Sequence, residues 1–290
     1  MLAYDVAGTG PAVVLLHSTA CDRRMWDPQW QVLTEAGYQV MRCDFRGFGS
    51  TPVPQGPYND ADDVLSVADE LDLGPVALVG SSYGGKVALE IAARQPERVT
   101  ALALLCSGMP GHEPTEALRA FWQQEEALIE AGDIGGAVEL NVATWLGPEA
   151  DEPTREAVRQ MQRHALEVQL AAPEEFEPVE VAVDLHAITA PSLVVAGAKD
   201  LPDFRLIAAE LAGLLPGARL SGARLPVARP PVARPPVARL PGTRPPGSAR
   251  LVAARLVELP WAGHLPTLER PRELSAMLVA FLREAFRPAI

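Results

Sequence analysis

The sequence predicts an α/β fold in which helices cover both faces of a parallel sheet. Short continuous apolar runs, typical of strands buried on both sides, alternate with segments whose apolar residues recur at helical spacing. The chain has 290 residues, of which 48% are hydrophobic, and this is enough to fill one large core. A helical insertion and a proline-rich stretch interrupt the pattern.

The first part of the chain contains four predicted strands separated by helices. The strands are the apolar runs 11–17, 38–44, 75–80 and 99–107. Helical patterns lie between them, at 26–37, 61–74 and 86–95. Gly37 and Gly74 stand where a glycine commonly ends a helix. Strand and helix therefore alternate as parallel pairing requires.

The alternation stops between residues 113 and 187, where helical spacing dominates and no buried strand is indicated. It resumes with strands and helices in turn, at 191–200, 204–215, 256–264 and 272–286. We therefore predict an α/β core formed by residues 1–112 and 188–290, with a helical insertion at 113–187.

Charge and cysteine content limit the classes of function. The formal net charge is −12 and the pI is about 4.9, which argues against a nucleic-acid partner or an anionic membrane surface. No apolar run is long enough for a transmembrane helix, and the first ten residues lack a signal-peptide pattern. Cys21, Cys43 and Cys106 have no metal-type spacing. These features predict a cytoplasmic protein without a metal site.

A pair of serines stands where a predicted strand turns into a helix. The stretch Gly80-Ser81-Ser82-Tyr83-Gly84 fits G-x-S-x-G with Ser82 as the central serine. A sharp turn of this kind exposes the serine on a strained backbone, and tiny neighbours let strand and helix approach. The helix also directs its N-terminal amides toward a negative charge formed there. The alternative is a glycine-rich helix start without chemistry.

A serine hydroxyl needs a base, and His264 is the favoured candidate among five histidines. It lies in a tight loop between the last predicted strand and the last predicted helix. The others end a strand or lie in or beside the insertion: His17, His112, His164 and His186.

The base in turn needs a carboxylate that fixes its tautomer, and two aspartates are available after the strand that begins near 191. Asp200 is closer to the strand end, whereas Asp203 fits a helix N-cap, so we favour Asp200 as the acid. Ser82, Asp200 and His264 then occur in the chain order serine, acid, histidine.

Five segments together resemble the α/β-hydrolase superfamily, in particular its esterase and enol-lactonase type. HSTACDRRMWDPQ (17–29) resembles the oxyanion loop, and CDFRGFGST (43–51) is similar to the D-x-R-G-x-G-x-S/T loop. GSSYGG, GAKD and AGH resemble the elbow, acid and histidine loops. The resemblance covers nearly all of the chain except 220–255. It implies a mostly parallel sheet of seven to eight strands flanked by helices, with residues 113–187 as a helical cap inserted after the sixth strand.

The resemblance also implies that the backbone amides of Thr19 and Tyr83 form an oxyanion hole. Besides the proline–arginine repeat, the chain departs from the family at two places. It has His17-Ser18 where the family usually has His-Gly. The family's first edge strand would precede LAYDVAGTG, so the sheet is expected to begin one strand late.

These residues predict a cofactor-independent serine hydrolase that cleaves a small-molecule carboxylic ester or lactone through an acyl-enzyme. The same triad can serve a carbon–carbon bond hydrolase or a perhydrolase, and a catalytically slow ligand-binding protein could keep the fold. Four side chains of the insertion are candidates for lining an acyl pocket, with packing inside the cap as the alternative: Trp122, Trp145, Met161 and Leu166.

Residues 220–255 carry a repeat of about A-R-P-P-V, with seven arginines and no acidic residue. Its paired prolines exclude helix and central strand and favour polyproline II or disorder. A basic arm of this kind could bind an acidic or proline-reading partner. We favour the alternative, a tolerated expansion in a disordered surface loop, because joining Arg219 to Leu256 gives the continuous stretch PGARLVELPWAGH.

Deleting residues 220–255 should leave kcat/KM within a few-fold and the melting temperature nearly unchanged, because each doubling of loop length costs only about 0.6 kcal/mol. Enzyme kinetics and thermal unfolding of the deletion variant measure both. Trypsin should also cut the intact protein first in this segment. Trypsin resistance there, or loss of activity on deletion, would contradict the prediction.

Overall fold

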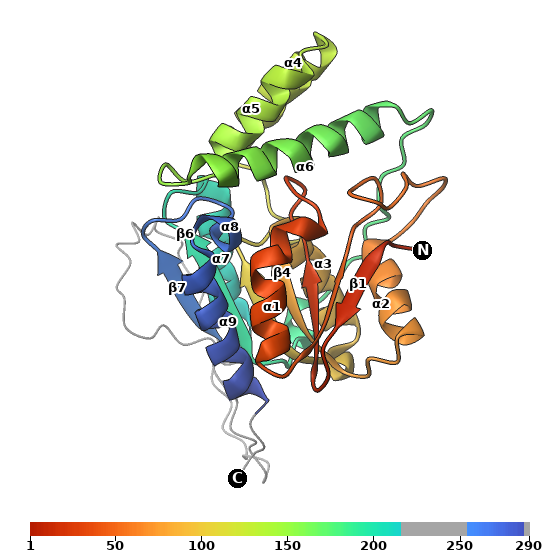
Figure 1. The fold of residues 1–290 in the computed structure, drawn as a ribbon, viewed down its shortest axis with the longest axis vertical. Helices are drawn as coiled ribbons and strands as arrows, with labels where there is room; N and C mark the ends of the chain where they lie inside the picture. The colour runs from red at the N-terminus through yellow and green to blue at the C-terminus, as the bar shows by residue number, and fades with distance from the viewer. Residues whose placement is uncertain (216–253, 287–290) are drawn as a thin grey trace, which may run out of the picture.

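The computed structural model describes residues 1–215 and 254–286, which form the predicted α/β fold (Figure 1). Seven strands make one sheet in the order β1-β3-β2-β4-β5-β6-β7. In chain order they are β1 (Tyr4–Ala7), β2 (Ala12–Leu16), β3 (Gln39–Cys43), β4 (Val76–Ser81), β5 (Val99–Leu105), β6 (Ser192–Gly197) and β7 (Arg255–Leu259). β1 is antiparallel to β3, and all other neighbouring strands are parallel. The predicted mostly parallel sheet is confirmed.

Helices cover both faces of this sheet, as Figure 1 shows. The core helices are α1 (Asp27–Glu35), α2 (Asp60–Glu70), α3 (Tyr83–Arg94), α7 (Pro202–Leu214), α8 (Pro266–Glu269) and α9 (Pro271–Ala285). The connection through α1 runs along the sheet in the direction opposite to those through α2, α3 and α7. Because parallel crossovers are right-handed, α1 lies on one face and these three helices on the other. α9 packs against α1 and shares its face.

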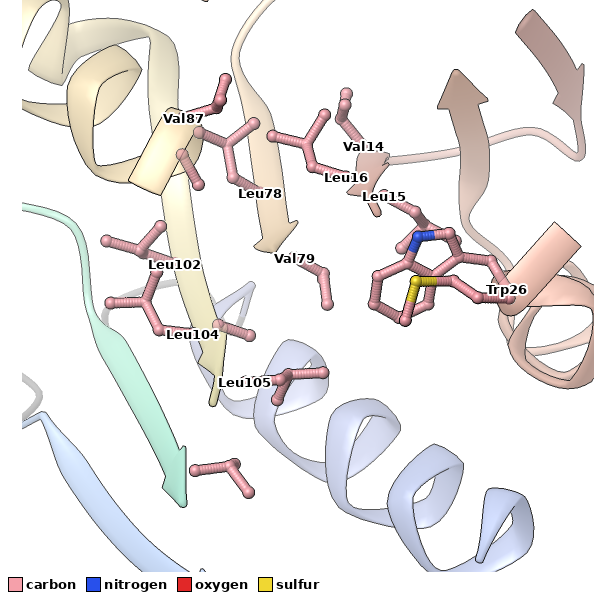
Figure 2. Packing of buried hydrophobic residues seen from close by; sticks show 14 of the residues in the cluster. Val14, Leu15, Leu16, Trp26, Leu78, Val79, Val87, Leu102, Leu104 and Leu105 are labelled. Atoms are coloured by element: carbon pink, nitrogen blue, oxygen red, sulfur yellow. The ribbon is translucent and has the colours of Figure 1, made fainter. Parts of the chain in front are cut away.

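The core lies in the central strands. Every residue of β2, β4 and β6 is buried, as expected for strands covered on both faces. Figure 2 shows side chains of β2, β4 and β5 packed against one another, with Trp26 beside them at the start of α1. The continuous apolar runs of the sequence are therefore the residues that fill the core.

Three helices form the predicted insertion between β5 and β6: α4 (Glu116–Glu130), α5 (Ile134–Trp145) and α6 (Glu152–Leu170). They lie together at one end of the molecule (Figure 1). They contact loops that follow the carboxyl ends of strands. Gln169 Nε2 donates to the Gly47 carbonyl at 3.2 Å, and the His264 N–H donates to the Trp145 carbonyl at 2.9 Å. The insertion thus covers the edge of the sheet where α/β proteins build their sites.

The insertion follows the fifth strand of the described sheet. The family pattern has eight strands, and its first edge strand has no counterpart among residues 1–215 and 254–286. The fifth strand of this sheet therefore corresponds to the sixth strand of the family pattern. The short helix α8 was not predicted from the sequence. Helix α3 begins three residues earlier than predicted, because Gly84 and Gly85 belong to its first turn.

Most of the proline–arginine repeat lies outside the described residues. The predicted boundary at 255 is wrong, because Ala254 is buried and Arg255 already belongs to β7, paired with Leu193 of β6. In the variant that lacks residues 220–255, Ala218 and Arg219 would precede Leu256 directly, so the same two residue types would replace Ala254 and Arg255 in the sequence. Within the described residues, no helix has the length and apolar character needed to span a membrane.

The turn from β4 into α3 is tightly packed at its glycines. A Cβ atom on Gly80 would lie 2.3 Å from the Gly84 carbonyl oxygen, and one on Gly84 would lie 2.3 Å from the Leu16 carbonyl oxygen. Real Cβ contacts are never this short, so both positions exclude every side chain. The steric reading of the glycine pattern is therefore confirmed.

Replacing Gly84 by alanine should lower stability by about 1–3 kcal/mol or more through overpacking, although alanine is the better helix former. The matched control is Gly213→Ala in α7, where an added Cβ meets nothing within 4 Å. That change should be neutral or stabilise by up to about 1 kcal/mol. Chemical denaturation of both variants measures the difference, and equal effects would contradict the steric reading.

Candidate active site

Ser82 occupies a strained turn between β4 and α3. Its backbone has φ 53° and ψ −116°, a left-handed φ that residues other than glycine rarely adopt. The strain is held by neighbours: the Ser82 N–H donates to the Leu105 carbonyl at 3.0 Å, and the Gly108 N–H donates to the Ser82 carbonyl at 2.9 Å. The side chain is 6% exposed. This is the conformation that a nucleophile elbow requires.

Asp200 and His264 form a buried pair. His264 Nδ1 lies 2.7 Å from Asp200 Oδ2, and both side chains are at least nine-tenths buried. Asp200 Oδ1 also accepts from the Leu201 N–H at 2.7 Å, which fixes the orientation of the carboxylate. Backbone bonds join the two loops, since the Lys199 N–H donates to the Ala262 carbonyl at 2.9 Å. The pair leaves Nε2 of His264 as the free ring nitrogen.

Asp203 serves a different purpose. Its carboxylate accepts from the Thr115 N–H at 2.7 Å and lies 3.0 Å from His112 Nε2, so it holds the start of α4. The alternative role as N-cap of α7 is wrong, because Asp203 is the second residue of that helix and Leu201 occupies the cap. Burial alone would raise the pKa of Asp203, but the hydrogen bonds outweigh it and lower the pKa.

Ser82 is connected to this pair through the end of β5. Cys106 follows Leu105, whose carbonyl accepts the Ser82 N–H. The Cys106 Sγ lies within 4.8 Å of a carboxylate oxygen of Asp200 and of a ring nitrogen of His264. In the described part of the chain, no hydrogen bond joins Ser82 Oγ to His264 Nε2. Catalytic hydrogen bonds of free enzymes are often long and shorten only when substrate binds.

The two candidate oxyanion donors are the backbone amides of Thr19 and Tyr83, and both residues line the same cavity. Neither the Thr19 nor the Tyr83 N–H has an acceptor among the described residues, so both amides remain available. Ser18, which replaces the usual glycine, has no left-handed φ, and its hydroxyl accepts from the Ala20 N–H at 3.2 Å. The serine therefore fits this loop without the conformational freedom of glycine.

A cavity of about 500 Å³ lies between the core and the insertion. Both Thr19 and Tyr83 line it, together with three of the four predicted pocket residues: Trp122, Trp145 and Leu166. Met161 does not line it; this side chain belongs to the cluster of buried hydrophobic residues. Ser82 and His264 are outside the lining, but the Trp145 ring lies 4.7 Å from the His264 ring.

The profile of the alpha/beta hydrolase family matches residues 13–277. The chain belongs to this family. The match extends over the strands, the insertion and the loops that carry Ser82, Asp200 and His264.

Several known alpha/beta hydrolases are similar to this chain. The proposed carbamate hydrolase RutD of Variovorax paradoxus is 30% identical over 211 residues, which are 69% of this chain and 78% of that protein. The 2-hydroxy-6-oxo-2,4-heptadienoate hydrolase of Pseudomonas putida is 33% identical, but the match spans only 43% of this chain and 47% of that protein. The enol-lactonase of Burkholderia xenovorans LB400 superimposes with a TM-score of 0.68 at 23% identity, covering 97% of this chain and 96% of the enol-lactonase, and shows the shared fold.

His17 of this hydrolase is structural. Its Nδ1 lies 2.8 Å from the Ser18 carbonyl, and its Nε2 accepts from the Phe45 N–H at 2.9 Å. Burial lowers the pKa of His17, so the ring is neutral with the proton on Nδ1. With both nitrogens engaged, His17 cannot act as the base, and it joins the Thr19 loop to the 43–51 loop.

Glu269 is a site residue that sequence reasoning missed. Its carboxylate accepts from the N–H groups of Gly263 at 3.0 Å and Leu265 at 3.3 Å, the two neighbours of His264. Burial raises the pKa of Glu269. No local pattern separates Glu269 from surface acids, because its function depends on how the loop folds back onto α8.

One group of residues among the described ranges brings donor atoms close enough for a metal ion: Cys106, Asp200 and His264. Burial raises the pKa of the Cys106 thiol well above its usual value. Asp200 already holds Nδ1 of His264, so an ion bound by these three residues would have to replace that hydrogen bond.

Asparagine variants of the two aspartates should fail in different ways. Asp200→Asn leaves His264 in the wrong tautomer and should lower the rate of p-nitrophenyl acetate hydrolysis by a factor on the order of 10⁴, with little change in stability. Asp203→Asn should lower the free energy of unfolding by about 1 kcal/mol through weakened hydrogen bonds to Thr115, with the rate of the folded enzyme retained.

The pH dependence of stability checks the second part. Since the folded state lowers the pKa of Asp203, its stabilisation is complete above the ordinary pKa of about 4 and is lost as the pH falls through the lowered value. The deficit of Asp203→Asn in denaturant titrations should therefore shrink in acid. A large rate loss confined to Asp203→Asn would instead make Asp203 the catalytic acid.

Proposed function

We propose that this protein is a serine hydrolase that cleaves a carboxylic ester or lactone through an acyl-enzyme on Ser82. The observation that carries the proposal is the strained Ser82 elbow next to a cavity, together with the buried Asp200–His264 pair at 2.7 Å. The Variovorax paradoxus and Pseudomonas putida relatives are hydrolases by name, and the enol-lactonase has the same fold. No other serine of the described residues combines such a backbone with these neighbours.

In the first half of the reaction, Ser82 Oγ attacks the substrate carbonyl while His264 Nε2 takes the hydroxyl proton. Asp200 keeps the other proton on Nδ1 and stabilises the imidazolium. The bond between the acyl carbon and the alcohol oxygen then breaks, and His264 returns its proton to the departing alcohol or, in a lactone, to the hydroxyl that stays attached. The acyl group is left as an ester of Ser82.

Negative charge on the carbonyl oxygen is met by the backbone N–H groups of Thr19 and Tyr83. The Tyr83 N–H is one of the free donors at the N-terminus of α3, where the helix dipole adds to its effect. In the second half, His264 takes a proton from water, whose oxygen attacks the acyl carbon. The bond between the acyl carbon and Ser82 Oγ then breaks, His264 returns the proton to Oγ, and the carboxylic acid is released. Helices α4, α5 and α6 act as a cap that shapes the cavity.

A carbon–carbon bond hydrolase is the second candidate, because the Pseudomonas putida relative is a hydrolase of this type by name. The name of its substrate is that of a carboxylate. Arg46 is the one cation among the described cavity residues, and Asp63 already binds it at 2.6 and 2.8 Å. A carboxylate would have no free cation here, and this favours the ester or lactone.

The nucleophile can be tested against its neighbour in the motif. Ser82→Ala should lower kcat by a factor on the order of 10⁶. Ser81→Ala should keep most of the activity, and stability should be unchanged or slightly higher, because the buried Ser81 hydroxyl has no hydrogen-bond partner. Steady-state kinetics and denaturation measure the two effects.

Labelling by a fluorophosphonate probe provides an independent readout. The wild type and Ser81→Ala should be labelled, and Ser82→Ala should not. An unlabelled wild type would favour a ligand-binding protein over a hydrolase, and labelling that depends on Ser81 would show that the wrong serine was assigned.

A further inference from the structure

Asp60 is a buried carboxylate that the proposed reaction does not use. It is the first residue of α2, it is 4% exposed, and it lines the cavity. Its Oδ2 accepts from the Tyr83 hydroxyl at 2.6 Å, whereas its Oδ1 is buried without any hydrogen-bond partner. A buried acceptor left unpaired is costly, so beside a cavity it favours a partner such as water or a donor group of a ligand.

Tyr83 connects this carboxylate to the reaction centre. It follows Ser82 directly, so its backbone N–H faces the oxyanion while its phenol reaches Asp60. Burial and the neighbouring Asp60 raise the pKa of Tyr83, so the phenol remains a neutral donor. The Tyr83 ring packs edge-on against Phe45 at 5.5 Å, which holds it in place. Asp60 therefore stands one tyrosine side chain and one hydrogen bond away from the elbow.

The charge of the cavity points to the class of group that Asp60 receives. Its described lining has five acidic residues: Asp60, Glu125, Glu174, Glu175 and Glu177. The single cation, Arg46, is paired with Asp63 outside the lining. The cavity also contains Gln162 from α6, whose Oε1 is a second buried acceptor without a partner. Free acceptors and negative charge favour hydrogen-bond donors and disfavour anions.

We infer that the cavity selects ester or lactone substrates that carry a hydroxyl or ammonium group, and that Asp60 accepts a hydrogen bond from this group. The inference rests on the proposed function and specifies its substrate class. Substrates that carry a second carboxylate are disfavoured. Asp60 contacts the hydroxyl or ammonium group at the end of the substrate away from the carbonyl and so determines which substrates bind. Ser82, Asp200 and His264 act on the carbonyl.

Four p-nitrophenyl esters of equal chain length test the inference: hexanoate, 6-hydroxyhexanoate, 6-aminohexanoate and the monoester of adipate. The wild type should hydrolyse the hydroxyl and ammonium esters with kcat/KM about tenfold or more above that of hexanoate, and the adipate monoester least efficiently. A preference for the ammonium ester alone would identify a cationic substrate, and equal preference would identify a neutral donor. Equal rates for all four esters, or a preference for adipate, would overturn the inference.

Asp60→Asn replaces the free oxygen by an amide while a carbonyl remains for the Tyr83 hydroxyl. The ratio of kcat/KM for the 6-aminohexanoate ester to kcat/KM for the hexanoate ester should fall about tenfold or more. The corresponding ratio for the adipate monoester should rise. The matched control is Asp62→Asn, which removes the same charge from the same helix turn at an exposed position outside the cavity, where Asp62 pairs with Arg94. Its ratios should equal those of the wild type, and equal shifts in both variants would contradict a contact at Asp60.

The wild type alone gives a second test that does not depend on the variant folding. Burial, with smaller contributions from Asp63 and Glu90, raises the pKa of Asp60 to about 6, against the opposing effects of the Tyr83 hydrogen bond and Arg46. The ratio of kcat/KM for the 6-aminohexanoate ester to that for hexanoate should therefore fall as the pH drops through 6, because Asp60 loses its charge. Any effect of pH on the reaction step that is common to both esters cancels in the ratio. Glu125 lines the cavity and accepts a hydrogen bond from Asn141, and burial raises its pKa as well. If the ratio falls with pH in Asp60→Asn as it does in the wild type, the fall is due to Glu125 and the inference is overturned.

Binding to Ser82→Ala separates the substrate class from the reaction. Calorimetric titration with the same four esters needs no turnover, and the ammonium and hydroxyl esters should bind about tenfold more tightly than hexanoate. If the wild type hydrolyses none of the esters but this order holds, the proposed reaction fails and the cavity's selectivity stands. If the wild type hydrolyses all four without preference, the reaction stands and the inference fails.

Discussion

The close approach of three backbone segments at the end of β4 is the constraint on which the site depends. The Gly80, Gly84 and Leu16 backbones meet where any Cβ would overlap a carbonyl oxygen. Only this closeness lets helix α3 start immediately after the strand, and the chain must then pass through the left-handed conformation of Ser82. The strain at one residue is stabilised by packing over many, which is how a fold keeps a reactive side chain in an unfavourable backbone.

The rest of the site is assembled on the same edge of the sheet by parallel pairing. β6 and β7 deliver Asp200 and His264 to adjacent loops, and backbone hydrogen bonds hold the loops together. The insertion is tied to this arrangement at two points. Trp145 of α5 accepts the His264 N–H, and Asp203 holds Thr115 at the start of α4. These hydrogen bonds join the insertion to the histidine loop and to the start of α7, so the cavity and the Asp200–His264 pair are parts of one packed unit.

The electrostatics of the site follow from burial. Cys106 and His17 are kept neutral by their surroundings, so neither competes with the Asp200–His264 pair. Asp60 and Glu269 are carboxylates whose pKa values burial raises, yet they differ in their partners. Glu269 is satisfied by backbone amides and acts on structure, whereas Asp60 keeps a free oxygen beside the cavity. The difference in hydrogen bonding, and not the depth of burial, separates a structural acid from one available to a substrate.

The sequence by itself determined the α/β class, most of the strands and the position of the insertion, because these follow from local hydrophobic periodicity. It also determined Ser82, since the glycines that permit the turn are contiguous with it. Tertiary structure alone decided which aspartate meets His264, because Asp200 and Asp203 differ by three residues and only the folded loops show their partners. It likewise decided that Met161 packs inside the core and that Asp60 lines the cavity. Such contacts join residues far apart in the chain, and no local pattern records them.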